Sequence, residues 1–284
     1  MIRLDAATVL LQWAVGGLAF LWLTTRGREV GIGYGWLLRG TYVAIAASAV
    51  VAGVWLESVP VREASAAGVA VAASVALGLS VVRRKAGVAG EHRLAAERKA
   101  RVSEMTGIER DTHQRDPNAA EFPPTADLVA PAIGVIGLIA ASADAGGPLV
   151  LSLARTLVGA AFLGAVSDAM LLGHWYLVQP GLPRRPLLEL ISWLGRLWPI
   201  EVALLLVPTG MVSAITGDVD DGAAGLLTWF WVACAVATLV LVVVTRAALR
   251  ERSYSAVMAA TGLLYLAILT AFGTDLVARA ILTS

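Results

Sequence analysis

The chain has 284 residues, of which 58% are hydrophobic and only 15% are charged. Soluble domains carry about 25% charged residues, so this composition, with its mean hydropathy of +0.75, excludes a conventional water-soluble enzyme and predicts a membrane protein. The 22 basic side chains are balanced by 21 acidic ones, so no nucleic-acid partner is expected. The single cysteine, Cys234, excludes an intrachain disulfide and a cysteine-based metal site.

Apolar stretches long enough to cross a bilayer recur along the chain. A bilayer core about 30 Å thick needs roughly 20 mainly apolar residues per helix. The candidate stretches are 6–24, 36–56, 64–82, 128–143, 149–178, 187–215, 223–244 and 254–273. We therefore predict an all-α, polytopic integral membrane bundle of about eight transmembrane helices. Residues 1–82 would hold helices one to three, 83–126 a charged loop, and 127–284 helices four to eight.

The fourth stretch is short, and the charges of the loops decide whether it crosses. With eight crossings, every strongly basic loop falls on one side of the membrane. These loops contain Arg26, Arg28, the segment 83–115, Arg184, Arg185, Arg246, Arg250 and Arg252. The acidic loops, with Glu57, Glu63, Asp144, Asp218, Asp220 and Asp221, fall on the other side. Because cytoplasmic loops are enriched in Lys and Arg, we predict a multi-pass protein of the cell membrane with both termini non-cytoplasmic.

The segment 83–126 is the one large hydrophilic loop, and we expect it in the cytoplasm. Its part 91–105 has the composition of a short helix, whereas 111–124, with three prolines, predicts an irregular tether. Such a loop can dock another subunit or lie on anionic lipid, and a solvated connector is the simpler interpretation. The expected partners are therefore the lipid bilayer and other membrane or cytoplasmic subunits.

Asp168 is the most deeply placed acidic residue of the predicted fifth helix. Ionisable groups at membrane depth are costly and are candidates for function, so Asp168 is a proton-coupling candidate. It extends a row with Ala160 and Gly164 at four-residue spacing, and small residues in such a row let another helix approach closely. A neutral carboxyl group with a purely structural role is the alternative. Arg155, near the start of the same helix, is expected to snorkel to the interface.

His174 is the histidine that the predicted topology places at membrane depth, and it precedes Trp175 and Tyr176. A histidine there can bond a quinone carbonyl, ligate a haem iron or relay a proton. With one such histidine, a haem held by two histidines of this chain is excluded. An interfacial histidine bonded to a neighbouring carbonyl, beside belt aromatics, is the plain alternative.

The predicted sixth helix is longer than one span and contains two prolines. We expect a partly interfacial helix over 187–197, a bend at Pro199, a span that follows it, and a second break at Pro208. Glu201 would then lie at a depth close to that of His174. A carboxylate at that depth would fix the histidine ring, so we predict that the two side chains pair.

The rest of the sequence contains no motif that defines a catalytic centre. Walker, zinc-protease and serine-elbow patterns are missing, so no metal site is predicted. Near the end of the chain, Asp275 and Arg279 have the spacing of an i to i+4 ion pair. We expect this pair at the outer surface, with a stabilising role only.

Three functions remain open on this sequence. The leading hypothesis is a non-catalytic membrane subunit or anchor associated with electron transfer, which binds quinone or haem near the cytoplasmic face. The residues expected to line that pocket are His174, Trp175, Tyr176 and Glu201. The alternative is a proton-coupled secondary transporter of a small solute that uses Asp168 and the breaks at Pro199 and Pro208. A third is a membrane enzyme with Asp168 and Glu201 as acid and base.

Overall fold

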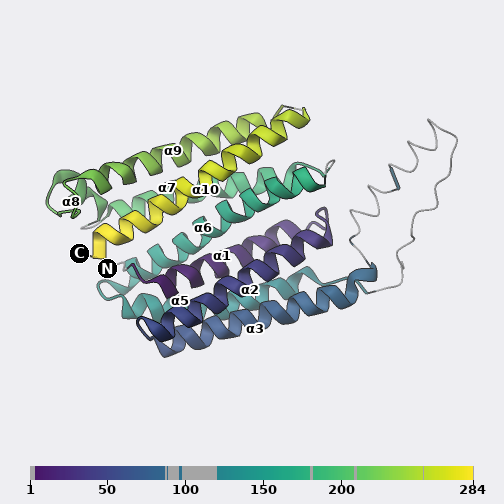
Figure 1. The fold of residues 1–284 in the computed structure, drawn as a ribbon, viewed down its shortest axis with the longest axis horizontal. Helices are drawn as coiled ribbons and strands as arrows, with labels where there is room; N and C mark the ends of the chain where they lie inside the picture. The colour runs from purple at the N-terminus through teal and green to yellow at the C-terminus, as the bar shows by residue number, and fades with distance from the viewer. Residues whose placement is uncertain are drawn as a thin grey trace.

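The computed structural model describes residues 4–86, 88, 96–97, 120–179, 182–207, 210–251 and 253–283, and every regular element in these ranges is helical. Eight long helices of the described chain form an elongated bundle (Figure 1). They are α1 (Ala6–Thr25), α2 (Ile32–Trp55), α3 (Pro60–Val82), α5 (Val129–Asp144), α6 (Leu149–Val178), α7 (Arg185–Leu206), α9 (Leu226–Ala248) and α10 (Tyr254–Thr283). The short elements are η1 (Arg83–Ala86), η2 (Pro124–Leu128) and α8 (Met211–Thr216). The predicted all-α polytopic bundle is confirmed.

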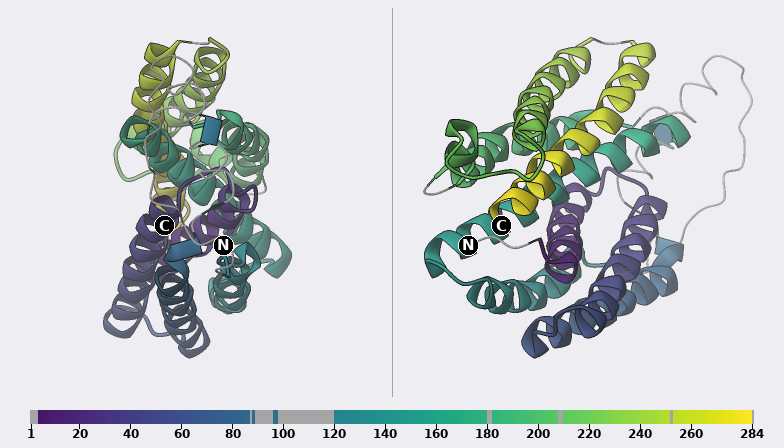
Figure 2. Two further views of the ribbon diagram at one scale, coloured as in Figure 1. Left: turned by 90° about the vertical axis from the view of Figure 1, so that its right-hand side faces the viewer. Right: turned by 60° about the vertical axis from the view of Figure 1, so that its left-hand side comes forward.

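Helices α1 and α6 lie against each other at the centre and join two groups of helices. In the first group α1 packs against α2 and α5, and α3 packs against both of those helices. In the second group α6 packs against α7 and α10, and α9 packs against both of these. Figure 2 shows the two groups at opposite sides of the α1–α6 contact. The α1–α6 contact is therefore the seam of the molecule.

Most basic loop residues lie at one end of the bundle, and most acidic loop residues lie at the other. One end, called the basic end below, carries Arg26, Arg28, Arg83, Arg84, Arg184, Arg185, Arg246 and Arg250. The other, the acidic end, carries Glu57, Glu63, Asp144, Asp218, Asp220 and Asp221. Helix α1 begins and α10 ends at the acidic end (Figure 1). The loops of the described chain thus alternate between the two ends as predicted.

Seven helical segments of the described chain are long and apolar enough to cross a membrane. The fourth is the continuous segment Pro124–Asp144, in which η2 extends the 16-residue α5 to 21 residues. This segment connects the basic end to the acidic end. The short fourth stretch is therefore a helix that runs from one end of the bundle to the other, as predicted.

Helix α7 is the eighth long helix, and it is less apolar because it carries Arg185, Glu189, Arg196 and Glu201. Its ends show that it also runs the length of the bundle. At its start, Arg184 donates to the carbonyl of Ser253 at the basic end, at 2.8 Å. At its other end, the carbonyl of Leu204 accepts from a side chain near the start of α6, at 2.8 Å.

The structure differs from the predicted division of 187–215 in one respect, because 187–197 and the residues after Pro199 form a single helix. Helix α7 is continuous from Arg185 to Leu206 with Pro199 inside it. A proline removes one helical N–H, but neighbouring packed helices let a membrane helix keep its course. Helix α7 ends at Leu206 and α8 begins at Met211, which agrees with a break near Pro208, a residue outside the described ranges.

The loop 83–126 is described only at its edges. Arg83–Ala86 continues α3 as η1, and the described chain resumes at Ala120 before η2. At this edge Arg83 donates to the carbonyl of Glu121 at 3.0 Å. The helix predicted for 91–105 and the tether predicted for 111–124 lie largely outside the described residues.

Asp221 organises the acidic turn that precedes α9. Its Oδ1 accepts from the backbone N–H groups of Ala223 and Gly225, at 2.9 and 2.8 Å. Its Oδ2 accepts from the backbone N–H of Thr228 at 2.9 Å and from the Thr228 hydroxyl at 3.1 Å. These bonds favour the charged carboxylate, and the one from the Thr228 N–H contributes most, so the pKa of Asp221 is lowered to about 2.

We expect Asp221→Asn to lower the unfolding temperature at neutral pH, with a difference from the wild type that shrinks in acid. The pKa of Asp221 falls from 3.8 in the free group to about 2 in the fold, so its contribution is complete above about pH 4 and is lost toward pH 2. Thermal unfolding in detergent from about pH 6 to about pH 2 measures it. The control is Asp220→Asn, because the carboxylate of Asp220 accepts only from the Gly222 N–H in this turn. A difference that is constant with pH would contradict this role.

Candidate functional site

The centre of the bundle contains a buried carboxyl group, that of Asp168 on α6. Asp168 is 0% exposed, and its Oδ1 accepts a hydrogen bond from the hydroxyl of Tyr42 on α2. Its Oδ2 has no hydrogen-bond partner in the described part of the chain. Tyr34, eight residues before Tyr42 on α2, places its hydroxyl 3.5 Å from the backbone carbonyl of Asp168. One oxygen of this carboxyl group therefore accepts a hydrogen bond, and the other has no donor among the described residues.

Small residues make this arrangement possible. A Cβ on Gly16 of α1 would lie 1.8 Å from the carbonyl oxygen of Ala160, and one on Gly164 would lie 2.2 Å from the carbonyl carbon of Gly16. A Cβ on Gly17 would lie 1.9 Å from the Tyr42 ring, so a glycine at this position leaves the space that the ring occupies. The close helix approach predicted from the row Ala160, Gly164 and Asp168 is confirmed, and α1 is the helix that approaches.

A second group of buried polar side chains lies toward the acidic end, around Gly159 of α6. Arg279 on α10 donates to both oxygens of Asp275, at 2.7 and 3.0 Å, and the two side chains are 1% and 0% exposed. A Cβ on Gly159 would lie 3.0 Å from Nε2 of Gln12 and 3.2 Å from Oδ1 of Asp275. Because Gly159 has no side chain, these polar groups can converge beside it.

The Asp275 and Arg279 pair was predicted at the outer surface, and that prediction is wrong. The i to i+4 spacing was recognised correctly, but both side chains are buried because α10 continues for 30 residues and packs against α6. Gln12 on α1 is also 0% exposed, and its Nε2 donates to the carbonyl of Thr156 at 2.6 Å. The three side chains form one interhelical polar group.

Arg155 was expected to snorkel to the interface, yet it is 4% exposed and turned into the bundle. Its Nε donates to the carbonyl of Leu204 at 2.8 Å and its Nη2 to the carbonyl of Val207 at 2.7 Å. The residue four positions after Leu204 is Pro208, which has no N–H to offer this carbonyl. Arg155 therefore supplies the donors that the end of α7 lacks, and its positive charge lies at the negative end of the helix dipole.

Glu201 on α7 joins the same region. It is 1% exposed, and neither carboxyl oxygen accepts a hydrogen bond from a described residue. Its carboxyl group lies within hydrogen-bond reach of that of Asp275, and its charge also interacts with those of Arg279 and Arg155. Together with Gln12, these four residues are called the Glu201 cluster below.

The predicted pairing of Glu201 with His174 is wrong. Nδ1 of His174 lies 3.0 Å from the hydroxyl of Tyr265 on α10, whereas Glu201 interacts with Asp275 ten residues further along that helix. Ten residues of helix correspond to about 15 Å. The depth assigned to Glu201 was shifted because 187–197 was counted as interfacial rather than as the first part of the span.

His174, Trp175 and Tyr176 also point in different directions. His174 is exposed on the surface of the bundle beside Tyr265. Trp175 donates to Oε1 of Gln179 at 3.0 Å and packs against the Tyr34 ring, while Tyr176 is 3% exposed and donates to the carbonyl of Pro183 at 2.6 Å. The four residues predicted to line one pocket therefore do not meet.

Asp168 and Glu201 are likewise separate. Asp275 and Arg279, with which Glu201 interacts, lie beside Gly159, which precedes Asp168 by nine residues of α6, or about 14 Å. An acid and a base that act on one bond must both lie within hydrogen-bond reach of it. The two carboxyl groups do not have the geometry of such a pair.

A cavity at the acidic end borders the Glu201 cluster at Arg279. It measures about 20 Å³, enough for a water molecule. Its lining includes Thr8, Ser152 and Thr156 and the charged residues Asp5, Glu57, Arg62 and Asp144. Arg62 bonds both Asp5 and Glu63 and is 2% exposed, so ion pairs order this part of the acidic end.

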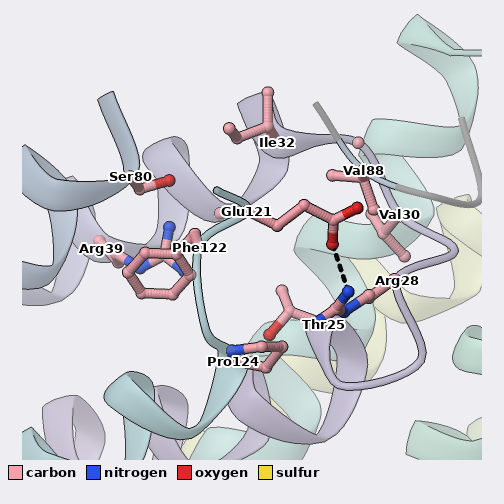
Figure 3. Close-up of a pocket in the computed structure, with 12 residues that line it drawn as sticks. Thr25, Arg28, Val30, Ile32, Arg39, Ser80, Val88, Glu121, Phe122 and Pro124 are labelled. Atoms are coloured by element: carbon pink, nitrogen blue, oxygen red, sulfur yellow. Dashed lines mark hydrogen bonds and ion pairs between the residues drawn. The ribbon is translucent and has the colours of Figure 1, made fainter. Parts of the chain in front are cut away.

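A second cavity, of about 40 Å³, lies at the basic end (Figure 3). Arg39 forms two 2.7 Å bonds with the carboxylate of Asp127, and both side chains are buried. The Phe122 ring covers the Arg39 guanidinium at 4.3 Å, and Arg28 pairs with Glu121 at the rim. Both arginines drawn in Figure 3, Arg28 and Arg39, are paired with carboxylates. These pairs hold the edge of the loop in place, and neither arginine is left to bind an anionic ligand.

Fold and site define a membrane-embedded helical bundle with carboxyl groups buried at two depths. No protein-family model, no curated protein and no solved structure matches the chain. Sequence reasoning found Asp168 and Glu201 but missed Gln12, Arg39 and the role of Arg155. For Arg155 a signal was present, since Pro208 leaves a carbonyl of the preceding helix turn without its usual donor.

Proposed function

We propose that the protein is a proton-coupled secondary transporter of a small solute, with Asp168 as the proton-binding residue. The basic end would face the cytoplasm and both termini the outside of the cell membrane, in keeping with the enrichment of Lys and Arg in cytoplasmic loops. The observation that carries the proposal is Asp168 itself, a fully buried carboxyl group at the seam between the two helix groups, with one oxygen that bonds to none of the described residues.

The argument rests on what a buried carboxyl group costs and what the seam allows. Burying a carboxylate without compensating donors is unfavourable, so a protonated Asp168 is favoured when the site is closed. Tyr42 gives the charged form one hydrogen bond, which makes release of the proton feasible when water reaches the open oxygen. Rocking of one helix bundle against another about a central site is how many secondary transporters alternate their access.

We expect Asp168→Asn to abolish solute accumulation driven by a pH gradient. Purified protein in liposomes would be screened with a panel of radiolabelled amines, amino acids and organic acids under an imposed gradient. For any solute that the wild type accumulates, Asp168→Asn should fall to the level of protein-free liposomes, because asparagine cannot carry the proton. Glu189→Gln, a change at a partly exposed ion pair of α7, should retain uptake.

The infrared spectrum of Asp168 gives a readout that needs no solute. The wild type should show a protonated-carboxyl band that disappears in Asp168→Asn and shifts in Tyr42→Phe, which removes the one hydrogen bond to that group. Full gradient-driven uptake by Asp168→Asn, or the absence of that band at every pH tested, would refute the proposal.

A membrane anchor for electron transfer is the second candidate, and one observation favours it. His174 and Tyr265 form a hydrogen-bonded pair on the surface of the bundle, where a ring from the lipid phase such as a quinone has access. Extraction of bound quinone from the purified protein, lost in His174→Ala, would support this candidate, as would a haem spectrum. Subunits that co-purify through the segment 83–126 belong to the same candidate.

A further inference from the structure

The carboxyl groups of Glu201 on α7 and Asp275 on α10 lie within hydrogen-bond reach of each other. Both residues are buried, at 1% and 0% exposure. Two ionised carboxylates offer only acceptor oxygens, and at this range their like charges repel strongly. The contact becomes favourable when one of the two groups holds a proton and donates it to the other.

The hydrogen bonds to Asp275 identify it as the charged member of the pair. Arg279 donates its Nε to Oδ2 and its Nη2 to Oδ1 of Asp275, at 2.7 and 3.0 Å. Two parallel bonds from one guanidinium favour an ionised carboxylate. Neither oxygen of Glu201 accepts a hydrogen bond from a described residue, and burial without donors favours the neutral acid. Glu201 is therefore the member that holds the proton.

The surrounding charges also allow this proton to leave. Among the described residues, the charged groups that act on Glu201 are Asp275 and Arg279 of α10 and Arg155 of α6. When Glu201 is ionised, two carboxylates face two guanidinium groups. When it is protonated, Arg155 still has the carbonyls and the negative dipole end of α7 beside it. Both protonation states are thus compensated.

The other helices that contact α7 do not change this balance. Helices α1 and α8 carry no titratable side chain. Helix α9 carries Cys234 and Arg246, and neither is among the groups that act on the charge of Glu201. The proton of Glu201 is therefore controlled by side chains of α6 and α10.

The cavity at the acidic end brings water close to this carboxyl pair. It has room for a water molecule, and Arg279, the side chain that holds Asp275, is part of its lining. Gly159, which lies beside Asp275, is nearer to the acidic end than Asp168 by nine residues of α6, or about 14 Å. The pair thus lies between the acidic end and Asp168.

We propose that Glu201 and Asp275 share one exchangeable proton and form a proton-binding site between the acidic end and Asp168. The proton is held by Glu201 and donated to Asp275, which Arg279 keeps charged. This assignment requires no transport and so goes beyond the proposed function. In a transporter, the pair would be a buried acid that a proton from the acidic end meets before Asp168.

Infrared spectroscopy of the purified protein tests the assignment on the wild type itself. Protein made with glutamate that is isotope-labelled at the side-chain carboxyl carbon separates glutamate bands from aspartate bands, so Asp168 does not interfere. The labelled wild type should show a protonated-glutamate band at neutral pH. The band should move to lower frequency in heavy water, because the proton exchanges, and Glu201→Gln should lose it.

Asp275→Asn distinguishes a shared proton from simple burial. The change removes the neighbouring negative charge and frees Arg279 to pair with Glu201, so the glutamate should ionise and its band should be lost. Glu189→Gln, at a partly exposed ion pair on the same helix as Glu201, is the matched control and should keep the band. Gel filtration and the unfolding temperature check that each variant is folded, and the measurement on the labelled wild type needs no variant.

Three results would overturn the assignment: no exchangeable glutamate band in the wild type, an unchanged band in Glu201→Gln, or an unchanged band in Asp275→Asn. The test is separable from that of the transport proposal. Asp168→Asn should keep the glutamate band, because Asp168 is about 14 Å away from Gly159 along α6. Uptake that depends on Asp168 without a glutamate band would remove the pair and leave the transporter, and a glutamate band without uptake would do the opposite.

Discussion

Replacing Arg39 with leucine should lower the free energy of unfolding by about 3–5 kcal/mol, the usual effect of removing one partner of a buried ion pair. Arg39 and Asp127 are joined by two hydrogen bonds and their side chains are only 3% and 1% exposed. Without Arg39 the Asp127 carboxylate would remain buried with no cation beside it. Because Asp127 lies in η2, the substitution should loosen the start of α5.

Unfolding by denaturant in mild detergent measures this effect, and two variants make it specific. The double substitution Arg39→Leu with Asp127→Leu should recover most of the loss, because it leaves no uncompensated charge. Arg26→Leu breaks an ion pair with Glu189 whose side chains are 44% and 33% exposed, and should cost about 0–1 kcal/mol. If Arg39→Leu and Arg26→Leu had equal effects, the buried pair would not be what holds η2 to α2.

The architecture was predictable because hydropathy and loop charge act locally. Each span is visible as a run of apolar residues of the required length, and alternation of basic and acidic loops resolved the short fourth span. The close helix approach along Ala160, Gly164 and Asp168 was also predictable from spacing, since residues four apart share one helix face. These features need no knowledge of which helix packs against which.

The site was predictable only in part, because it depends on the rotation and partners of each helix. Glu201 was recognised as a buried acid, but its neighbours on α10 are more than seventy residues away in the chain. The same holds for Arg39 and Asp127, 88 residues apart. Depth estimates failed where helix limits were misplaced, as in α7, and the pairing with His174 failed with them.

Substitution of Gly164 by alanine should be among the most damaging single-methyl changes in the described part of the chain. Its Cβ would lie 2.2 Å from the backbone of Gly16, so no side-chain movement relieves the clash and α1 must move away from α6. Overpacking of a close-packed core costs about 1–3 kcal/mol and sometimes more. Gly78→Ala on α3, where nothing lies within 4 Å of the new Cβ, should be neutral or slightly stabilising.

Gly17→Ala separates packing from function at the same seam. Its Cβ would lie 1.9 Å from the Tyr42 ring, a side chain that can turn aside, so we expect a smaller loss of stability than for Gly164→Ala. The displaced tyrosine would no longer donate to Asp168, and the infrared band of that carboxyl group should then shift as it does in Tyr42→Phe. A Gly17→Ala protein with an unchanged Asp168 band would show that Tyr42 does not control this carboxyl group.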